Sequence, residues 1–205
     1  MQVIEVYADV CCPFAHVGLR CVVERRSQLG RGDVALHIRA WPLELVNGTP
    51  LDPETTVKHA KDLQAQVAPE LFRHFDPDHF PRTSIPALAR AHAAYRKDMR
   101  TGEAVSLALR EALFERNLDI SRNAVLSEIA SAYGVGQANS ADEASVLGDW
   151  HDGIERGVKG SPHFFCGDHD AFCPTLDISK DKDGHLDVNA NLEELNAFLS
   201  ECLEG

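Results

Sequence analysis

The spacing of apolar residues divides the start of the chain into a strand, a helix and a second strand. The stretch VIEVYADV alternates and is rich in β-branched and aromatic residues, so we predict a strand over Gln2–Ala8. A helix is predicted from Pro13 to about Leu29, because proline is well tolerated at a first helical position and LGRG supplies a stop. VALHIRAW predicts a second strand, ended by Pro42. This order is typical of the opening of a βαβ unit with a parallel sheet.

The central part of the chain, from Asp52 to about Gly157, carries helical patterns. In GEAVSLALREALFERN four apolar residues share one stripe that we expect to be core: Val105, Leu109, Ala112 and Leu113. In the next helical segment, DISRNAVLSEIASAYG, Ser121 is placed to be the N-cap and Gly134 to end the helix.

The C-terminal part returns to strands and closes with a helix. SPHFFCGDHDAFCPTLDI predicts two short strands around a polar turn, and NLEELNAFLSECL predicts a helix. The acidic run DISKDKDGHLD is read as a solvated turn, because it lacks the spacing and the final glutamate of a calcium loop. The whole order predicts an α/β fold whose split domain, residues 1–51 and 158–205, holds an α-helical insertion at residues 52–157.

Composition and charge narrow the partners. With 205 residues and 44% hydrophobic content the chain is long enough to bury a core. A net charge of −12 argues against nonspecific binding to nucleic acid or to an anionic membrane, so small molecules or proteins are the expected partners. The N-terminus lacks the basic region and long apolar segment of a secretory signal, and no stretch approaches the length of a membrane span. We therefore expect a cytoplasmic protein.

The candidate nucleophile is Cys12, in the sequence YADVCCPFAHVG. At the N-cap of the first helix its sulfur would face unpaired backbone N–H groups and the positive end of the helix dipole. This setting favours a thiolate and predicts a pKa below that of a free cysteine. The alternative is a small residue that fills the corner between strand and helix.

These residues carry a resemblance to a known family. Asp9, Cys12, Pro13, Phe14 and Gly18 resemble the start of the DsbA-like thioredoxin superfamily, which also includes kappa-class glutathione transferases and hydroxychromene carboxylate isomerases. AWPLELVNG, ALFERNLDIS and GVKGSPHFF resemble later segments of the family in the right order. The resemblance implies a thioredoxin-like fold with an α-helical insertion and a cis peptide bond before Pro162. The site residues that it implies for substrate binding are Cys11, Pro13, Phe14, Ala15, Trp41, Ser161 and Pro162.

Two departures from the family pattern bear on the chemistry. Ala15 stands where dithiol members have the second cysteine of Cys-x-x-Cys, so the usual internal attack on a mixed disulfide at Cys12 is missing. This points to monothiol chemistry, completed by glutathione or another small thiol as co-substrate. His16 is four residues beyond Cys12, so its imidazole either helps to stabilise the thiolate as a second catalytic group or simply covers the helix surface.

Three functions are carried forward. The leading hypothesis is a thiol oxidoreductase that acts on a protein or small-molecule thiol or disulfide and has no bound cofactor. Whether it forms a homodimer is left open. The second is a kappa-type glutathione transferase or glutathione-dependent isomerase, which Ala15 favours and cysteine at position 12 disfavours. The third is a noncatalytic binding module.

Other cysteines and histidines suggest weaker alternatives. His163, Cys166, His169 and Cys173 are of the types that bind zinc, but they lack a paired Cys-x-x-Cys knuckle, and residues an odd number of positions apart on a strand point to opposite faces. No metal is therefore expected. A disulfide between Cys166 and Cys173 across the predicted hairpin stays open.

Overall fold

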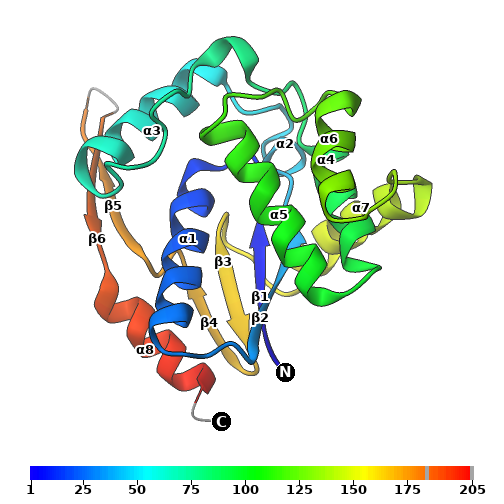
Figure 1. The fold of residues 1–205 in the computed structure, drawn as a ribbon. Coiled ribbons are helices and arrows are strands. Elements are labelled where there is room, and N and C mark those ends of the chain that lie inside the picture. Colours follow the sequence, from blue (N-terminus) through cyan, green and yellow to red (C-terminus); the bar gives the residue numbers. More distant parts are fainter. Residues whose placement is uncertain (183–184, 204–205) are drawn as a thin grey trace.

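A mixed four-stranded sheet lies at the centre of the molecule (Figure 1). The computed structural model describes residues 1–182 and 185–203, and its strands lie in the order β2-β1-β3-β4. Strand β1 (Gln2–Ala8) pairs in parallel with β2 (Val34–Ala40). Helix α1 (Pro13–Gln28) connects them, as the sequence predicts for a βαβ opening.

The C-terminal strands complete this sheet and add a second, smaller one. Strands β3 (His163–Cys166) and β4 (His169–Phe172) are antiparallel, and β3 pairs with β1. Strands β5 (Leu176–Lys180) and β6 (Leu186–Ala190) form a separate antiparallel pair. The solvated turn predicted for DISKDKDGHLD is therefore wrong at its ends, which are strands, while residues 183–184 of that run lie outside the described part of the chain.

Helices cover both faces of the sheet. On one face, α1 and α8 (Leu192–Leu203) pack against β1, β2 and β3, and the inward residues of α8 are those the sequence predicts: Leu195, Phe198, Leu199 and Cys202. On the opposite face, Tyr7 and Trp41 lie against α7 (Ser140–Glu155), where a side chain at Gly153 would collide with the Trp41 ring. The sheet is thus enclosed, as buried parallel strands require.

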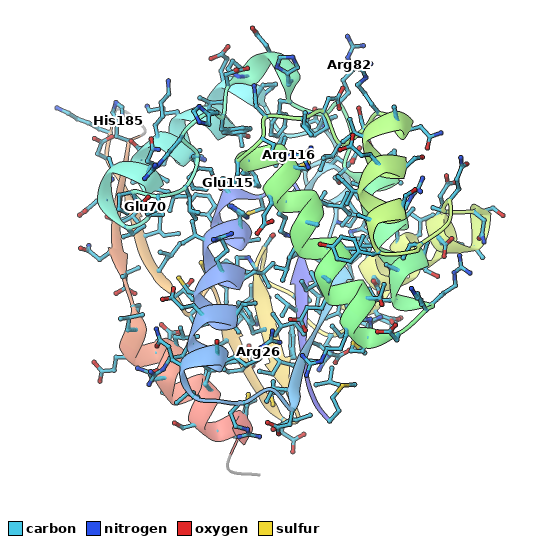
Figure 2. The ribbon with its side chains drawn as sticks, in the orientation of Figure 1. Arg26, Glu70, Arg82, Glu115, Arg116 and His185 are labelled. Carbon is cyan, nitrogen blue, oxygen red and sulfur yellow. The ribbon has the colours of Figure 1, made fainter. Side chains whose placement is uncertain are left out.

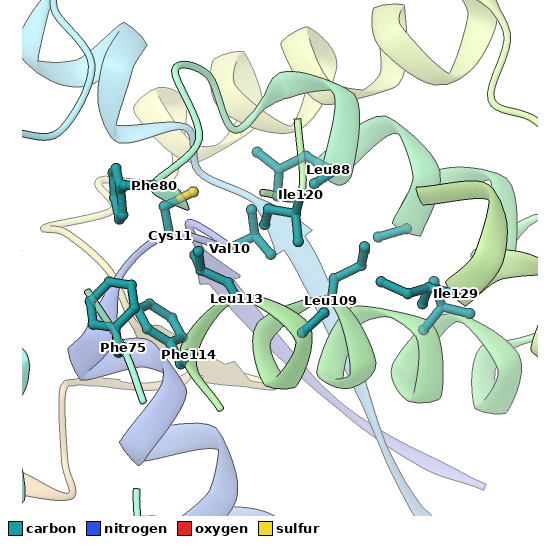
Figure 3. Close-up of a cluster of buried hydrophobic side chains, with 14 of the residues drawn as sticks. Val10, Cys11, Phe75, Phe80, Leu88, Leu109, Leu113, Phe114, Ile120 and Ile129 are labelled. Carbon is teal, nitrogen blue, oxygen red and sulfur yellow. The ribbon is translucent and has the colours of Figure 1, made fainter. Parts of the chain in front are cut away.

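The helices that lie between β2 and β3 in the sequence form one block. They are α2 (Leu43–Asn47), α3 (Pro53–Gln66), the 3-10 helix η1 (Pro77–His79), α4 (Ile85–Tyr95), α5 (Met99–Phe114), α6 (Asn123–Ala132) and α7. Their shared core includes the predicted stripe of α5 together with aromatic residues of the segment between α3 and α4 (Figure 3). Val10 and Cys11 enter this core, whereas the next residue, Cys12, belongs to the core under the sheet. The block and the sheet therefore meet at the loop that carries the cysteines.

Most element boundaries agree with the sequence prediction, and one cap does not. The chain has the predicted α/β, thioredoxin-like fold with helices inserted. Gly134 follows α6 with a positive φ of 62°, as predicted for a helix end. Ser121 is not the N-cap of α6, because its hydroxyl donates to Asp119 Oδ1 at 2.6 Å and Arg122 takes the cap position. Division of the chain into domains after residues 51 and 157 stays a prediction.

Candidate functional site

Asp9 organises the loop between β1 and α1. Its carboxylate is buried and accepts hydrogen bonds from the backbone N–H groups of Cys11, at 2.8 Å, and Leu43, at 2.6 Å. Its own N–H donates to Ser161 Oγ at 2.9 Å. Burial, the largest cause, raises the pKa of this carboxyl, while those two N–H groups lower it. Asp9 thereby joins the loop to the start of α2 and to the segment that precedes β3.

Cys12 lies where that loop becomes a helix and faces the Ser161–Pro162 segment. It is the N-cap residue of α1, followed by Pro13 at the first helical position. Its Sγ lies 3.2 Å from the carbonyl oxygen of Ser161, to which the thiol donates. The Ser161–Pro162 peptide bond is cis, which is the conformation that the family resemblance implies. The structure thus brings together the proposed nucleophile and the predicted docking segment, 149 residues apart in sequence.

The predicted low pKa of Cys12 is wrong for this state of the protein. The residue is only 3% exposed, and burial raises the pKa of its thiol above the ordinary value. Ser161 and the N–H groups of Ala15 and Phe14 act in the opposite direction, and the nearby Asp9 carboxylate adds to the rise. These N–H groups do not meet the geometry of a capping hydrogen bond to the sulfur, whose hydrogen-bond partner is the Ser161 carbonyl. The buried setting at rest therefore favours the protonated thiol over the thiolate.

His16 is not beside that thiol. Its Nε2 lies 2.7 Å from Glu115 Oε1, at the end of α5 (Figure 2), and its ring is enclosed by Phe72 and Phe114. Burial lowers the pKa of His16, against the opposing effect of Glu115. The i, i+4 spacing suggested that the imidazole lies next to Cys12, but the ring instead faces Glu115 at the end of α5. His16 also borders a groove of about 460 Å³ between α1 and α5, which Arg20 and Glu111 flank.

A larger groove begins at the Ser161–Pro162 segment. It has a volume of about 570 Å³ and runs between Phe14 and Ser161 at one end and the β5–β6 hairpin at the other. Phe14, Phe172, Leu176 and Ile178 give it apolar walls. Its ionisable lining residues are Cys173 and three carboxylates, Asp177, Asp187 and Glu194; none of the described lining residues is Lys or Arg. Because Ser161 both lines this groove and contacts Cys12 Sγ, the groove ends beside the thiol.

The other predicted substrate-binding residues are not all at this groove. Three of them, Cys11, Pro13 and Ala15, are buried and do not line this groove, so substrate contact by their side chains stays a prediction. Trp41 lies in a separate cluster with Tyr7 and Phe165, because its ring fills the space beneath Gly153. Phe14 and Ser161 are thus the predicted binding residues that line the groove.

Sequence reasoning missed Arg110. This residue lies one position beyond the apolar stripe of α5, where a charged side chain is ordinarily read as solvent-exposed, yet it is fully buried. Its guanidinium donates to the carbonyl oxygens of Ala8, at 3.5 Å, and Asp9, at 3.3 Å, and to Ser106. Only the i, i+4 pairing of Ser106 with Arg110 was visible in the sequence. Arg110 anchors the end of β1 immediately before the two cysteines.

The histidines and cysteines near the hairpin do not gather around one point. His163 Nε2 lies 2.8 Å from Asp170 Oδ2, and Cys166 pairs with His169 at the far end of β3 and β4. Among residues 1–182 and 185–203, no set of His, Cys, Asp and Glu side chains is arranged to hold a metal ion. All six cysteines are free thiols, and the strand register places Cys166 and Cys173 at opposite ends of the hairpin.

Comparisons with known proteins agree with this geometry. Residues 3–180 match the sequence model of the DSBA-like thioredoxin domain. A protein from Nitrosomonas europaea, provisionally named a protein disulfide isomerase, is 16% identical with a TM-score of 0.69, over 99% of this chain and 98% of that one. The cytosolic disulfide reductase DsbM from Pseudomonas aeruginosa is 15% identical with a TM-score of 0.62, over 98% of each chain.

An isomerase has the same fold. The 2-hydroxychromene-2-carboxylate isomerase is 16% identical with a TM-score of 0.62, over 83% of this chain and 88% of that one. No curated protein sequence matches the chain. Separately, within the described residues no helix has the length and apolar character needed to cross a bilayer.

Proposed function

We propose that this chain, which belongs to the DSBA-like thioredoxin domain family, is a thiol–disulfide oxidoreductase whose nucleophile is Cys12. The observation that carries the proposal is the 3.2 Å contact between Cys12 Sγ and the Ser161 carbonyl, at the end of a groove of about 570 Å³. A disulfide bound in that groove has one sulfur beside Cys12, where attack produces a mixed disulfide and releases a thiolate.

The groove supports binding of an extended or flexible partner. Phe14 and Phe172 line the groove together with Ser161 and offer aromatic surface to a bound partner. An apolar wall with a few polar groups is the usual composition of a small-molecule or peptide site. In this proposal Phe14 and Ser161 position the disulfide, and Asp9 holds Ser161 and the cysteine loop in place.

Ala15 leaves Cys12 without the usual neighbouring thiol, so a small thiol is the simplest agent to complete turnover. Glutathione is one candidate, and a structure of DsbM with glutathione shares this fold, with a TM-score of 0.62 and 14% identity. The three carboxylates of the groove favour a co-thiol of less negative charge than glutathione. A cytoplasmic location and a homodimer stay predictions.

A glutathione transferase or isomerase is the second candidate. The observation that favours it is the raised pKa of Cys12, because a protonated donor that positions a bound thiol does not need to ionise. The isomerase of the same fold supports this reading. In that case Cys12→Ser keeps activity, since a hydroxyl also donates a hydrogen bond.

The deciding experiment is the reduction of hydroxyethyl disulfide by the purified protein with a small thiol in excess. We expect turnover that Cys12→Ser abolishes and that Cys21→Ser leaves unchanged, because Cys21 lies more than two helical turns away from the N-cap. Turnover that survives in Cys12→Ser contradicts the proposal. Conjugation or isomerisation in both proteins then favours the transferase class, and inactivity of the wild type in every assay favours the binding module.

A further inference from the structure

A second cysteine contacts the same dipeptide as Cys12, through its backbone. The backbone N–H of Cys173 donates to the carbonyl oxygen of Pro162 at 3.0 Å, while Cys12 Sγ contacts the carbonyl of Ser161, one residue earlier. Two cysteines 161 residues apart in the chain therefore contact consecutive carbonyl groups of one short segment. Cys173 also lines the groove that ends at Ser161.

The chain that follows Cys173 runs along α1. Cys173 has a positive φ of 51° at the end of β4, and two residues later Thr175 reaches the helix. A Cβ atom on Gly18 of α1 would lie 3.2 Å from Thr175 Oγ1 and 3.3 Å from Pro162 Cγ. Pro162 and the 173–175 segment thus pack side by side against the first turns of the helix that begins at Cys12.

The other cysteines are held elsewhere. Cys11 is adjacent to Cys12, and a disulfide between neighbouring residues conflicts with the usual Cα separation of about 5.5 Å. Cys166 Sγ lies 3.9 Å from the Cys202 carbonyl, at the far end of β3. That end is four residues from Pro162, or roughly 13 Å along a strand.

We propose that Cys173 is the resolving thiol for Cys12, in place of the cysteine absent at position 15. This inference rests on the proposed function. Cys12 as a thiolate attacks one sulfur of a substrate disulfide, forms a mixed disulfide and releases the first substrate thiolate. Cys173, after losing its proton, attacks Cys12 Sγ, forms the Cys12–Cys173 disulfide and releases the second. The two protons lost by the cysteines are taken up by the two leaving thiolates.

The electron balance is that of a dithiol reductant. The protein loses two electrons and the substrate disulfide gains them, giving two thiols. A small-molecule thiol then restores the protein: two equivalents reduce the Cys12–Cys173 disulfide and leave as their own disulfide. The same pair, once oxidised, is able to oxidise a dithiol in the reverse direction.

Electrostatics supports the order of the two steps. Burial raises the pKa of Cys173 to about 12, and a negative charge on Cys12, on Glu194 of α8 and on Asp177 of β5 adds to the rise. While Cys12 is the attacking thiolate, its charge therefore keeps Cys173 protonated. In the mixed disulfide Cys12 cannot carry a charge, so Cys173 ionises without this repulsion and its attack follows that of Cys12.

The test uses the reduced 205-residue protein. It is oxidised with hydroxyethyl disulfide, quenched in acid and measured by intact mass and by peptide mapping. The wild type is expected to lose two hydrogen atoms and to yield a linked peptide pair containing Cys12 and Cys173. Cys173→Ser is expected to stop at the mixed disulfide on Cys12. Cys166→Ser, a comparably buried control in the same hairpin, should behave as the wild type.

The outcomes separate this inference from the proposed function. Two outcomes overturn the role of Cys173. In one, the wild type accumulates the mixed disulfide on Cys12, as Cys173→Ser does, and Cys12 is then a monothiol nucleophile. In the other, the linked peptide pair contains Cys11 and Cys12. Absence of any adduct or disulfide at Cys12 refutes the proposed function itself. The linked peptide is measured on the wild type, so the test holds even where Cys173→Ser fails to fold.

Discussion

Replacement of Arg110 by methionine removes a cation that is fully enclosed between α5 and the end of β1. The guanidinium donates to the carbonyls of Ala8 and Asp9, and it is the cation whose charge lowers the pKa of the buried Asp9 carboxyl. Methionine keeps much of the volume but leaves the carboxylate without that charge and the carbonyls without a donor. Loss of a charge that stabilises a buried carboxylate, together with loss of the donor to two buried carbonyls, costs about 3–5 kcal/mol.

The expected cost is large beside the roughly 5–15 kcal/mol that stabilises a domain of ordinary size. With an m value of about 2 kcal/mol/M in urea, Arg110→Met is expected to lower the unfolding midpoint by roughly 1.5–2.5 M. The measurement is urea denaturation followed by far-ultraviolet circular dichroism. Arg20→Met is the matched control, because Arg20 pairs with Glu111 on the surface of the molecule and such pairs contribute about 1 kcal/mol or less.

A double variant tests the cause. When Asp9 is also changed to asparagine, the uncompensated charge disappears, so Arg110→Met with Asp9→Asn should be less destabilised than the sum of the two single variants. A cost for Arg110→Met no larger than that of Arg20→Met refutes the reasoning. Strict additivity in the double variant refutes the electrostatic part of it and leaves only the lost carbonyl contacts.

Three further predictions concern the groove and the helix beside it. Burial raises the pKa of the Cys12 thiol, so the rate of its alkylation by iodoacetamide should still rise about tenfold per pH unit above pH 8. An alkylation rate that reaches its plateau below pH 7 contradicts this. Cystamine, a cationic disulfide, should oxidise the protein faster than oxidised glutathione, and Asp187→Asn or added salt should narrow the ratio; equal rates count against an electrostatic role for the groove. Burial lowers the pKa of His16 in the folded protein, so the unfolded chain binds a proton at this imidazole more tightly than the folded one. The stability that His16 contributes above its unfolded pKa of 6.5 is therefore lost as the pH falls through the folded pKa. His16→Gln should flatten this decline in urea midpoints, and parallel curves speak against it.

The local pattern of the chain was sufficient for most of the fold. Strands β1 and β2 alternate clearly, and α1 begins at a proline and ends near glycines, so their bounds followed from the sequence. The cap of α6 was missed because Asp119, two residues before Ser121, captures the hydroxyl. Strands β5 and β6 were missed because their residues alternate between exposed polar side chains and few apolar ones.

The site was less predictable, since its contacts join distant segments. Cys12 was found from its place at the start of the predicted helix and Ser161 through the family resemblance, but the exposure of the thiol depends on packing that no local pattern records. The partner of His16 is 99 residues away, and the carbonyl of Asp9 bound by Arg110 is 101 residues from it. Spacing along one helix suggested a role for His16 next to Cys12, and a carboxylate on another helix determined its actual position.

The place of β3 in the sheet has a consequence for biosynthesis. This strand lies between β1 and β4, although it is made long after β1 and β2. While the intervening helices leave the ribosome, one edge of β1 has no strand to pair with and the sulfur of Cys12 lacks the cover of Ser161. The nascent chain therefore passes through a stage in which the sulfur of Cys12 and an open sheet edge are exposed together, and that edge is a site where chains can associate wrongly unless a chaperone covers it.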